Sequence, residues 1–351
     1  MIEPSNPPVQ ETILICSWLE AEHVGQIRRH DPRVRVEYHP DLLAPPRYPA
    51  DHTGGAFQRS EAAEAIWRQL LGSATIFFDF DRTHLEDLPR LAPNVRWIQA
   101  TSAGIGQLMH RRRYSERMPD TVVTTASGVH IRPLAEFVAL SMMMHSRRTL
   151  DMIRAQSAHH WERFSGSDLE GRTVLIVGLG AIGESVAKLS RALGMTVLGI
   201  RRSPGSGGSS LAHEVHRPEA LSDLLPRADF LVLIAPLTDQ TRGMIGAEEL
   251  ARLQPGSALI NIGRGALVDE MALIQSLQLG HLGGAYLDVF QEEPLPPDSP
   301  LWEMPNVLVS PHSGSTSDRE NARLTDLFCN NLTRWLHGQA LRNVYDAKRG
   351  Y

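Results

Sequence analysis

Apolar and polar residues follow two different periods along the chain. Short apolar runs rich in β-branched residues are typical of strands buried on both faces. Between them, apolar residues return about every three or four positions, as in amphipathic helices. The runs predict strands at residues 12–17, 34–38, 74–80, 95–101, 122–125, 173–177, 196–200, 230–235, 258–262, 285–289 and 307–310. The longer stretches predict helices at residues 20–29, 60–71, 131–147, 184–193, 248–253, 270–279 and 318–337, and one more that carries Leu85, Leu88 and Leu91.

This alternation runs through both halves of a chain of 351 residues, which is long enough for two domains. We therefore expect an α/β fold with two doubly wound parallel sheets of the Rossmann and flavodoxin-like kind. Ser127 and Gly128 mark the point where the chain leaves the first domain. The helix at 131–147 is apolar around too much of its circumference for one buried stripe, so it is expected to pack against a partner as well.

The most informative local pattern is a strand, a glycine turn, a helix and a second strand at residues 173–200. Gly178, Gly180 and Gly183 form a G-x-G-x-x-G directly after the first strand. In this context Gly178 makes the tight turn, Gly180 lets the backbone approach a pyrophosphate, and Gly183 lets the helix pack closely. The pattern predicts a dinucleotide site, with a turn that binds nothing as the alternative.

The end of the second strand selects between dinucleotides. An acidic residue there binds the ribose 2′-hydroxyl of NAD, whereas this chain has Arg201, Arg202 and Ser203 and no acid. Arginine donates bidentately to phosphate oxygens, so these residues favour the 2′-phosphate of NADP, with NAD possible. The alternative is that both arginines are solvated surface residues.

Composition narrows the class of protein. The net charge of −5 argues against nucleic-acid binding, and the longest basic cluster is only three residues, Arg111 to Arg113. Two cysteines indicate no disulfide framework and a reducing compartment. The first ten residues lack the pattern of a signal peptide, and no apolar run is long enough to span a membrane. The expectation is a cytoplasmic protein.

Three polar residues follow predicted strands, at the sheet edge where ligands bind in open α/β folds. Arg264 lies after the strand at 258–262, Glu293 after the strand at 285–289, and His312 after the strand at 307–310. Each alone has an ordinary explanation, because loop arginines and surface glutamates are common and the chain has 15 histidines.

Together with the glycine turn, these residues give the chain a resemblance to the D-isomer-specific 2-hydroxyacid dehydrogenases, from about residue 91 to residue 351. The stretches that carry it are residues 97–105, 126–130, 135–137, 178–183, 236–241, 261–270, 284–294 and 310–312. The resemblance implies that a dinucleotide-binding domain at 128–315 is inserted in a substrate domain formed by 1–127 and 316–351. It also implies an active site between the two domains.

The resemblance gives each catalytic residue a role. Arg264 binds the substrate carboxylate and polarises the keto oxygen, and His312 donates the proton to that oxygen during reduction. Glu293 pairs with the imidazole and raises its pKa. The backbone amides of Ala103 and Gly104 form a second contact with the carboxylate. Phe80, in the loop expected above the substrate, suits a small or apolar side chain.

The resemblance also implies the cofactor contacts. Asp288 meets the nicotinamide carboxamide, and no metal is expected. The full set of expected contacts is Gly178, Gly180, Ala181, Ile182, Gly183, Arg201, Arg202, Ser203, Ala235, Pro236, Thr241, Ile262, Gly263, Asp288, His312, Ser313 and Gly314. The chain departs from the common pattern at Gly106, where the family often has Asp. It also departs at Arg201, which agrees with the NADP-preferring glyoxylate and hydroxypyruvate reductases.

We therefore expect an NADP-preferring oxidoreductase that transfers a hydride between nicotinamide and a small 2-keto or 2-hydroxy acid. A two-fold homodimer through the helix at 131–147 is also expected. The same site on another 2-keto acid or on phosphite is an alternative, while Glu293 counts against a formate dehydrogenase. The alternative of another class is a dinucleotide-sensing binding protein like the C-terminal-binding corepressors, which the acidic charge disfavours.

Overall fold

The computed structural model describes residues 11–202 and 210–347. The chain divides into two compact units, each with its own parallel sheet. Unit 1 comprises Met1–Val129 and Thr316–Tyr351, and unit 2 is the continuous segment His130–Ser315 between them. The predicted α/β class with two parallel sheets is confirmed.

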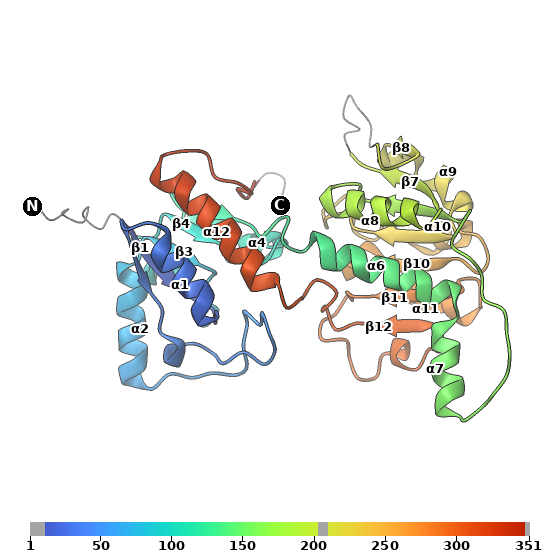
Figure 1. The fold of residues 1–351 in the computed structure, drawn as a ribbon, viewed down its shortest axis with the longest axis horizontal. Helices are drawn as coiled ribbons and strands as arrows, with labels where there is room; N and C mark the ends of the chain where they lie inside the picture. Colours follow the sequence, from blue (N-terminus) through green and yellow to red (C-terminus); the bar gives the residue numbers. More distant parts are fainter. Residues whose placement is uncertain (1–10, 203–209, 348–351) are drawn as a thin grey trace, which may run out of the picture. The chain divides into compact units, whose positions relative to one another are not determined.

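The sheet of unit 1 has five strands in the order β2-β1-β3-β4-β5, the flavodoxin-like order (Figure 1). Its strands are β1 (Glu11–Ile15), β2 (Val34–Glu37), β3 (Ile76–Phe78), β4 (Trp97–Gln99) and β5 (Val122–Thr124). Its helices are α1 (Ala21–His30), α2 (Glu61–Ser73), α3 (Leu88–Leu91), α4 (Gly106–Arg112), α5 (Tyr114–Arg117) and α12 (Glu320–Leu336).

Successive residues of β1 enter different cores of unit 1, because neighbouring side chains on a strand point to opposite faces. Leu14 packs with Trp67 of α2 on one face, whereas Ile13 and Ile15 pack with Phe328 of α12 on the other. α12, near the end of the chain, therefore covers one face of the sheet that contains β1. Ser60 caps the N-terminus of α2, because its hydroxyl accepts from the amide of Ala63 at 3.3 Å.

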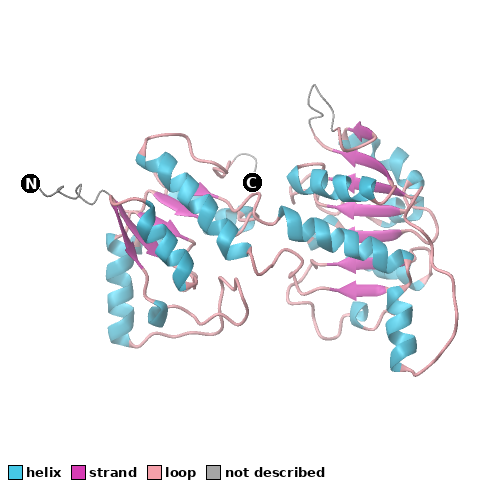
Figure 2. Ribbon diagram, in the orientation of Figure 1, coloured by secondary structure: helices cyan, strands magenta, loops and turns pink. Residues whose placement is uncertain are grey.

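The sheet of unit 2 has seven strands in the order β12-β11-β10-β9-β6-β7-β8, with helices on both faces (Figure 2). Its strands are β6 (Thr173–Val177), β7 (Thr196–Ile200), β8 (Glu214–His216), β9 (Phe230–Leu233), β10 (Ala258–Asn261), β11 (Gly284–Leu287) and β12 (Val307–Val309). Its helices are α6 (Ile131–Ser146), α7 (Thr149–Ser157), α8 (Ala181–Ala192), α9 (Leu221–Leu224), α10 (Ala247–Arg252) and α11 (Glu270–Gln278).

The strand order of unit 2 indicates which edge of the sheet binds ligands. The connections run one way from β6 to β8 and the other way from β9 to β12, so strand order reverses between β6 and β9. Ligands of open α/β sheets bind outside the carboxyl ends of the strands at such a reversal. Two apolar layers hold the sheet, one with Val174 and Ile176 and the other with Leu175 and Val177. The glycine turn leaves β6 at this point.

Several elements lie where the sequence pattern predicted none. β8 is an edge strand of alternating polar residues without an apolar run, and α7 was not expected after α6. α8 begins at Ala181 rather than at residue 184, because the helix starts directly after the second glycine of the turn. The short helices α4 and α5 were also missed. None of these differences changes the order of the predicted strands.

Candidate functional site

Arg264 is held in the loop after β10 by the last residue of that strand. The buried side chain of Asn261 accepts from the amide of Gly263 at 3.1 Å and donates to the carbonyl of Arg264 at 3.0 Å. The Arg264 guanidinium donates to the carbonyl of Gly263 at 2.6 Å. Asn261 was not among the expected site residues, although a buried asparagine at the end of an apolar strand was a signal for it.

Glu293 and His312 come from the loops after β11 and β12 and meet in a hydrogen bond. Nδ1 of His312 lies 2.8 Å from Oε2 of Glu293, with the two side chains 47% and 37% exposed. The other carboxylate oxygen of Glu293 accepts from the amide of Phe290 at 3.0 Å, which fixes the carboxylate within its own loop. An ionised carboxylate can only accept a hydrogen bond, so Nδ1 carries the proton of this bond and Nε2 takes no part in it.

Asp288 shapes the turn that presents His312. Its buried carboxylate oxygen accepts from the hydroxyl of Ser310 at 2.5 Å and from the amides of Ser313 and Gly314 at 2.9 and 2.8 Å. These bonds fix the residues on either side of His312. The φ of His312 is 53°, in the left-handed region that residues other than glycine rarely adopt. Such a conformation persists where surrounding contacts determine it, and it is frequent at functional sites.

The charges of this cluster act on one another. The hydrogen bond to Glu293 raises the pKa of His312, while burial opposes that rise. Burial by itself would raise the pKa of Glu293, but its hydrogen bonds to His312 and Phe290 outweigh burial and hold that pKa below its usual value. Burial lowers the pKa of Arg264, opposed by the charge of Glu293, and raises the pKa of Asp288. Arg264, Glu293 and His312, predicted from separate loops, thus form one electrostatic cluster.

The glycine turn has the close contacts that its pattern predicts. Gly178 has a φ of +108°, and a Cβ on it would lie 2.6 Å from the amide nitrogen of Ala235 after β9. A Cβ on Gly183 would lie 2.6 Å from the carbonyl oxygen of Gly178, so α8 packs tightly on the turn. By contrast, a Cβ on Gly180 would have no atom within 4 Å. This open side of the turn, at the start of α8 with Ala181 and Ile182, fits a pyrophosphate.

The surroundings of Arg201 differ from the sequence expectation in one respect. No acid was expected near it, yet Oε1 of Glu184, in the first turn of α8, lies 3.9 Å from its guanidinium. The buried Nε of Arg201 has no hydrogen-bond partner among residues 11–202 and 210–347. A guanidinium with unused donors fits a phosphate group. Arg202 follows in the next position, and Ser203 lies outside the described residues.

The other expected cofactor contacts follow β9 and β10. Ala235 and Ile262 are buried, and Gly263 packs so closely that a Cβ on it would lie 3.1 Å from the carbonyl oxygen of Ala235. Thr241 closes the loop that begins at Pro236, because its hydroxyl donates to the carbonyl of Pro236 at 2.7 Å. These residues lie at the carboxyl ends of adjacent strands, next to the glycine turn.

Unit 1 contains the remaining expected residues. Ala103 and Gly104 lie in the loop between β4 and α4, where the amide of Gly104 donates to the hydroxyl of Ser102 at 3.2 Å. Phe80 is fully buried and stacks on Tyr114 with ring centroids 5.7 Å apart. Because the Phe80 ring is buried in the core of unit 1, its surface is not exposed for the expected contact with a substrate. Its polar neighbour Arg82, with a side chain 31% exposed, lies on the surface of the same loop.

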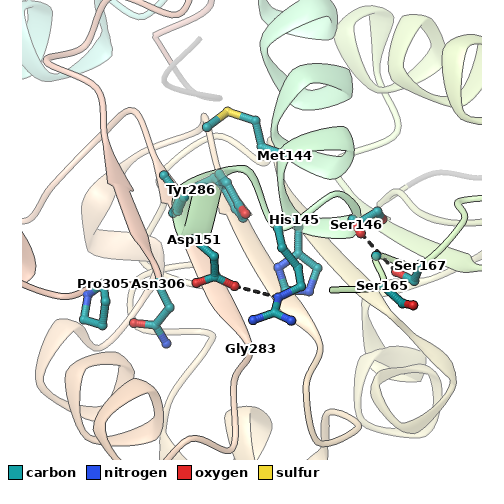
Figure 3. A pocket seen from close by; sticks show the side chains of 13 residues that line it. Met144, His145, Ser146, Asp151, Ser165, Ser167, Gly283, Tyr286, Pro305 and Asn306 are labelled. Carbon is teal, nitrogen blue, oxygen red and sulfur yellow. Dashed lines mark hydrogen bonds and ion pairs between the residues drawn. The ribbon is translucent and has the colours of Figure 1, made fainter. Parts of the chain in front are cut away.

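A cavity of about 360 Å³ lies at the opposite edge of the sheet of unit 2 (Figure 3). Gly283 and Asn306, which line it, precede β11 and β12, whereas Asp288 and His312 follow these strands. The cavity is therefore remote from Arg264, Glu293 and His312, and none of these three residues lines it. Within residues 11–202 and 210–347, no group of three or more His, Cys, Asp or Glu is arranged to hold a metal ion. No helix in the described part of the chain is long and apolar enough to cross a membrane.

Comparison with known proteins places this site in a family. Residues 139–314 match the model of the D-isomer specific 2-hydroxyacid dehydrogenase, NAD binding domain. Glyoxylate/hydroxypyruvate reductase B of Yersinia pestis is 34% identical over 74% of this chain and 79% of its own length.

Two solved structures extend the likeness to nearly the whole chain. A D-isomer specific 2-hydroxyacid dehydrogenase from Xanthobacter autotrophicus, in complex with NADPH and MES, has a TM-score of 0.77 at 28% identity and covers 97% of this chain and 99% of its own. NADPH-dependent glyoxylate/hydroxypyruvate reductase from Sinorhizobium meliloti, in complex with NADP and sulfate, has a TM-score of 0.76 at 25% identity and covers 97% of this chain and 100% of its own.

The fold is that of a nicotinamide-dependent oxidoreductase. The chain belongs to the family of D-isomer specific 2-hydroxyacid dehydrogenases. The suspected family and the expected enzyme class are thereby confirmed.

Proposed function

We propose that the protein is an NADP-preferring reductase of small 2-keto acids, of the glyoxylate and hydroxypyruvate type. The observation that carries the proposal is the hydrogen bond of 2.8 Å between His312 and Glu293, with Arg264 in the neighbouring loop. Reduction of a 2-keto acid requires a proton donor, a carboxylate that raises the pKa of that donor, and a cation that binds the substrate carboxylate. The relatives named for glyoxylate and hydroxypyruvate support this substrate class.

Each residue of the cluster has a defined task in this proposal. Arg264 binds the carboxylate of the substrate and polarises the adjacent keto oxygen. His312 donates the proton from Nε2 to that oxygen, while Glu293 on Nδ1 keeps the imidazole protonated to higher pH. Asp288 holds the turn that contains His312. The bound cofactor supplies the hydride.

The preference for NADP rests on Arg201. It follows β7, its buried Nε is unpaired among the described residues, and no acidic residue follows the strand in the position that serves NAD. The complexes of two related structures with NADPH or NADP support this choice, and NAD remains a weaker cofactor.

Steady-state turnover tests the proposal. The 351-residue chain is assayed with NADPH and NADH on a panel of glyoxylate, hydroxypyruvate, pyruvate and larger 2-keto acids. Phosphite and formate are assayed in the oxidising direction with NADP+ and NAD+. We expect the highest kcat/KM with NADPH and glyoxylate or hydroxypyruvate. Equal kcat/KM for both cofactors contradicts the NADP preference. Binding of NADPH without turnover of any substrate would instead indicate a dinucleotide-sensing protein.

We also propose a homodimer built on α6. Leu140 and Met143 of α6 are 47% and 42% exposed, and Met152 and Ile153 of α7 are 42% and 50% exposed. Exposed apolar residues on two consecutive helices are typical of a surface that a partner covers. Light scattering at micromolar concentration tests this, and replacing Leu140 and Met143 by Glu is expected to give monomers.

We also propose that the protein works in the reducing cytoplasm. Its two cysteines, both buried and free, support this location.

A further inference from the structure

The ion pair between Arg201 and Glu184 joins the two elements that surround the expected 2′-phosphate position. Arg201 directly follows β7, and Glu184 lies in the first turn of α8, after the glycine turn. Their side chains are 24% and 30% exposed, with NH1 and Oε1 3.9 Å apart. The carbonyl of Ile200 accepts from the amides of Gly178 and Leu179 at 3.0 and 2.9 Å. The backbone next to Arg201 is therefore fixed to the turn that faces the pyrophosphate.

The geometry of this pair leaves Arg201 incompletely engaged. A separation of 3.9 Å is beyond hydrogen-bond length, so the carboxylate acts on the guanidinium by charge. Guanidinium has five donors, and the buried Nε of Arg201 has no partner in the described part of the chain. The amide of Arg201 donates to the carbonyl of His216 in β8 at 3.1 Å, which keeps the residue at this edge. Arg201 is thus placed for an anion while a fixed anion of the protein already neutralises part of its charge.

We propose that Glu184 limits the discrimination between NADP and NAD, because its carboxylate competes with the 2′-phosphate for Arg201. This inference rests on the proposed role of Arg201 in binding NADP. A phosphate monoester carries a charge of about −1.5 to −2 at neutral pH and is repelled by a carboxylate on the same guanidinium. The 2′-hydroxyl of NAD is uncharged and does not experience this repulsion. Glu184 therefore weakens NADP binding selectively and leaves NAD as a usable cofactor.

Binding measurements on the full-length protein test this proposal without any substrate. NADPH and NADH are titrated by fluorescence, and 2′,5′-ADP and ADP by calorimetry, which isolates the 2′-phosphate from the nicotinamide. We expect Glu184→Gln to tighten NADPH and 2′,5′-ADP by about two- to fivefold, the effect of a partly exposed charge pair, with NADH and ADP unchanged. In an Arg201→Gln background, the same change is expected to have a smaller effect.

Glu303→Gln is the matched control. It removes the same charge from an exposed position before β12, at the other end of the strand order from β7 and β8, and is expected to leave all four affinities unchanged. Unchanged or weaker binding of 2′,5′-ADP by Glu184→Gln overturns the proposal, because weaker binding would mean that Glu184 holds Arg201 in position. If the parent binds 2′,5′-ADP no better than ADP but Glu184→Gln creates a preference, the proposed NADP preference fails while the role of Glu184 is supported.

Discussion

A Cβ on Gly265 would lie 1.9 Å from the carbonyl carbon of Phe290, so the two backbones pack with no space for a side chain between them. Gly265 follows Arg264, and the amide of Phe290 donates to Glu293. This contact joins the loop that carries the cation to the loop that carries the carboxylate.

Gly265→Ala is therefore expected to separate these two loops. Overpacking against backbone costs typically about 1–3 kcal/mol, and the displaced Arg264 should lower kcat/KM beyond the loss of folded protein. Urea unfolding and steady-state kinetics measure the two effects. Gly72→Ala is the control, because Gly72 lies in α2 and a Cβ there would be 3.6 Å from the carbonyl of Leu91. That variant should be as stable as the parent or more stable. An unimpaired Gly265→Ala variant would show that the loops are not rigidly joined.

His312→Gln removes the proposed proton donor. The kcat for reduction is expected to fall by about 10²- to 10⁴-fold, the usual contribution of general acid catalysis. His130→Gln, at the residue that precedes α6, is the comparison. If His312→Gln retains a near-normal kcat and His130→Gln does not, the acid has been assigned to the wrong histidine.

Glu293→Gln should move the pH profile of reduction. Glu293 raises the pKa of His312, and reduction uses the protonated imidazole, so activity is lost as the pH rises through that pKa. Gln keeps an oxygen for the amide of Phe290 but removes the charge, so the pKa falls toward about 6.5. The loss of activity then begins at lower pH, and the oxidation profile moves in the same direction. Glu292→Gln, the exposed neighbour, should leave both profiles in place.

Asp288→Asn should act in the same direction as Glu293→Gln but less strongly. The charge of Asp288 also raises the pKa of His312, after the larger effect of Glu293. Asn retains an oxygen for the amides of Ser313 and Gly314, so the turn should survive. Asp288→Ala removes the shared acceptor of these partly exposed amides and is expected to destabilise unit 2 by about 0.5–1.5 kcal/mol for each lost hydrogen bond. A larger pH shift in Asp288→Asn than in Glu293→Gln would reverse the proposed roles.

Arg264→Lys tests whether the geometry of the cation matters. Lysine keeps the charge but loses the planar fork that matches a carboxylate. We expect kcat/KM to fall by about ten- to hundredfold, mostly through KM, because charge-assisted hydrogen bonds contribute about 1.5–3 kcal/mol. With the parent enzyme, replacing the 2-keto acid by its methyl ester should lower kcat/KM by a similar factor. If the ester is turned over as well as the acid, Arg264 does not bind the substrate carboxylate.

The sequence predicted most of the strands, and the positions of Arg264, Glu293 and His312 after them, for a common physical reason. Parallel strands buried on both faces carry continuous apolar runs, and β6 and β7 were predicted with the bounds that the structure has. The carboxyl ends of such strands share one edge, so Arg264, Glu293 and His312 were expected at that edge. Their joint role was predicted from the resemblance to the family.

Other features depend on contacts that a linear pattern does not contain. β8 pairs only at the sheet edge and needs no apolar run. The direction of the Phe80 ring depends on its packing against Tyr114, and the proximity of Glu184 to Arg201 depends on how α8 lies beside β7. The need for glycine at position 265 arises only from the approach of another backbone.

The continuity of unit 2 has a consequence for how such a protein changes over time. One uninterrupted stretch of chain, His130–Ser315, carries the glycine turn, Arg264, Glu293 and His312. A single exchange of gene segments with two crossover points can therefore transfer the proposed proton-transfer machinery between related genes. Residues on the flanking segments, such as Ala103 and Gly104, can diverge independently of that machinery. The residues proposed for the cofactor and for proton transfer can thus be exchanged together, separately from mutations in the rest of the chain.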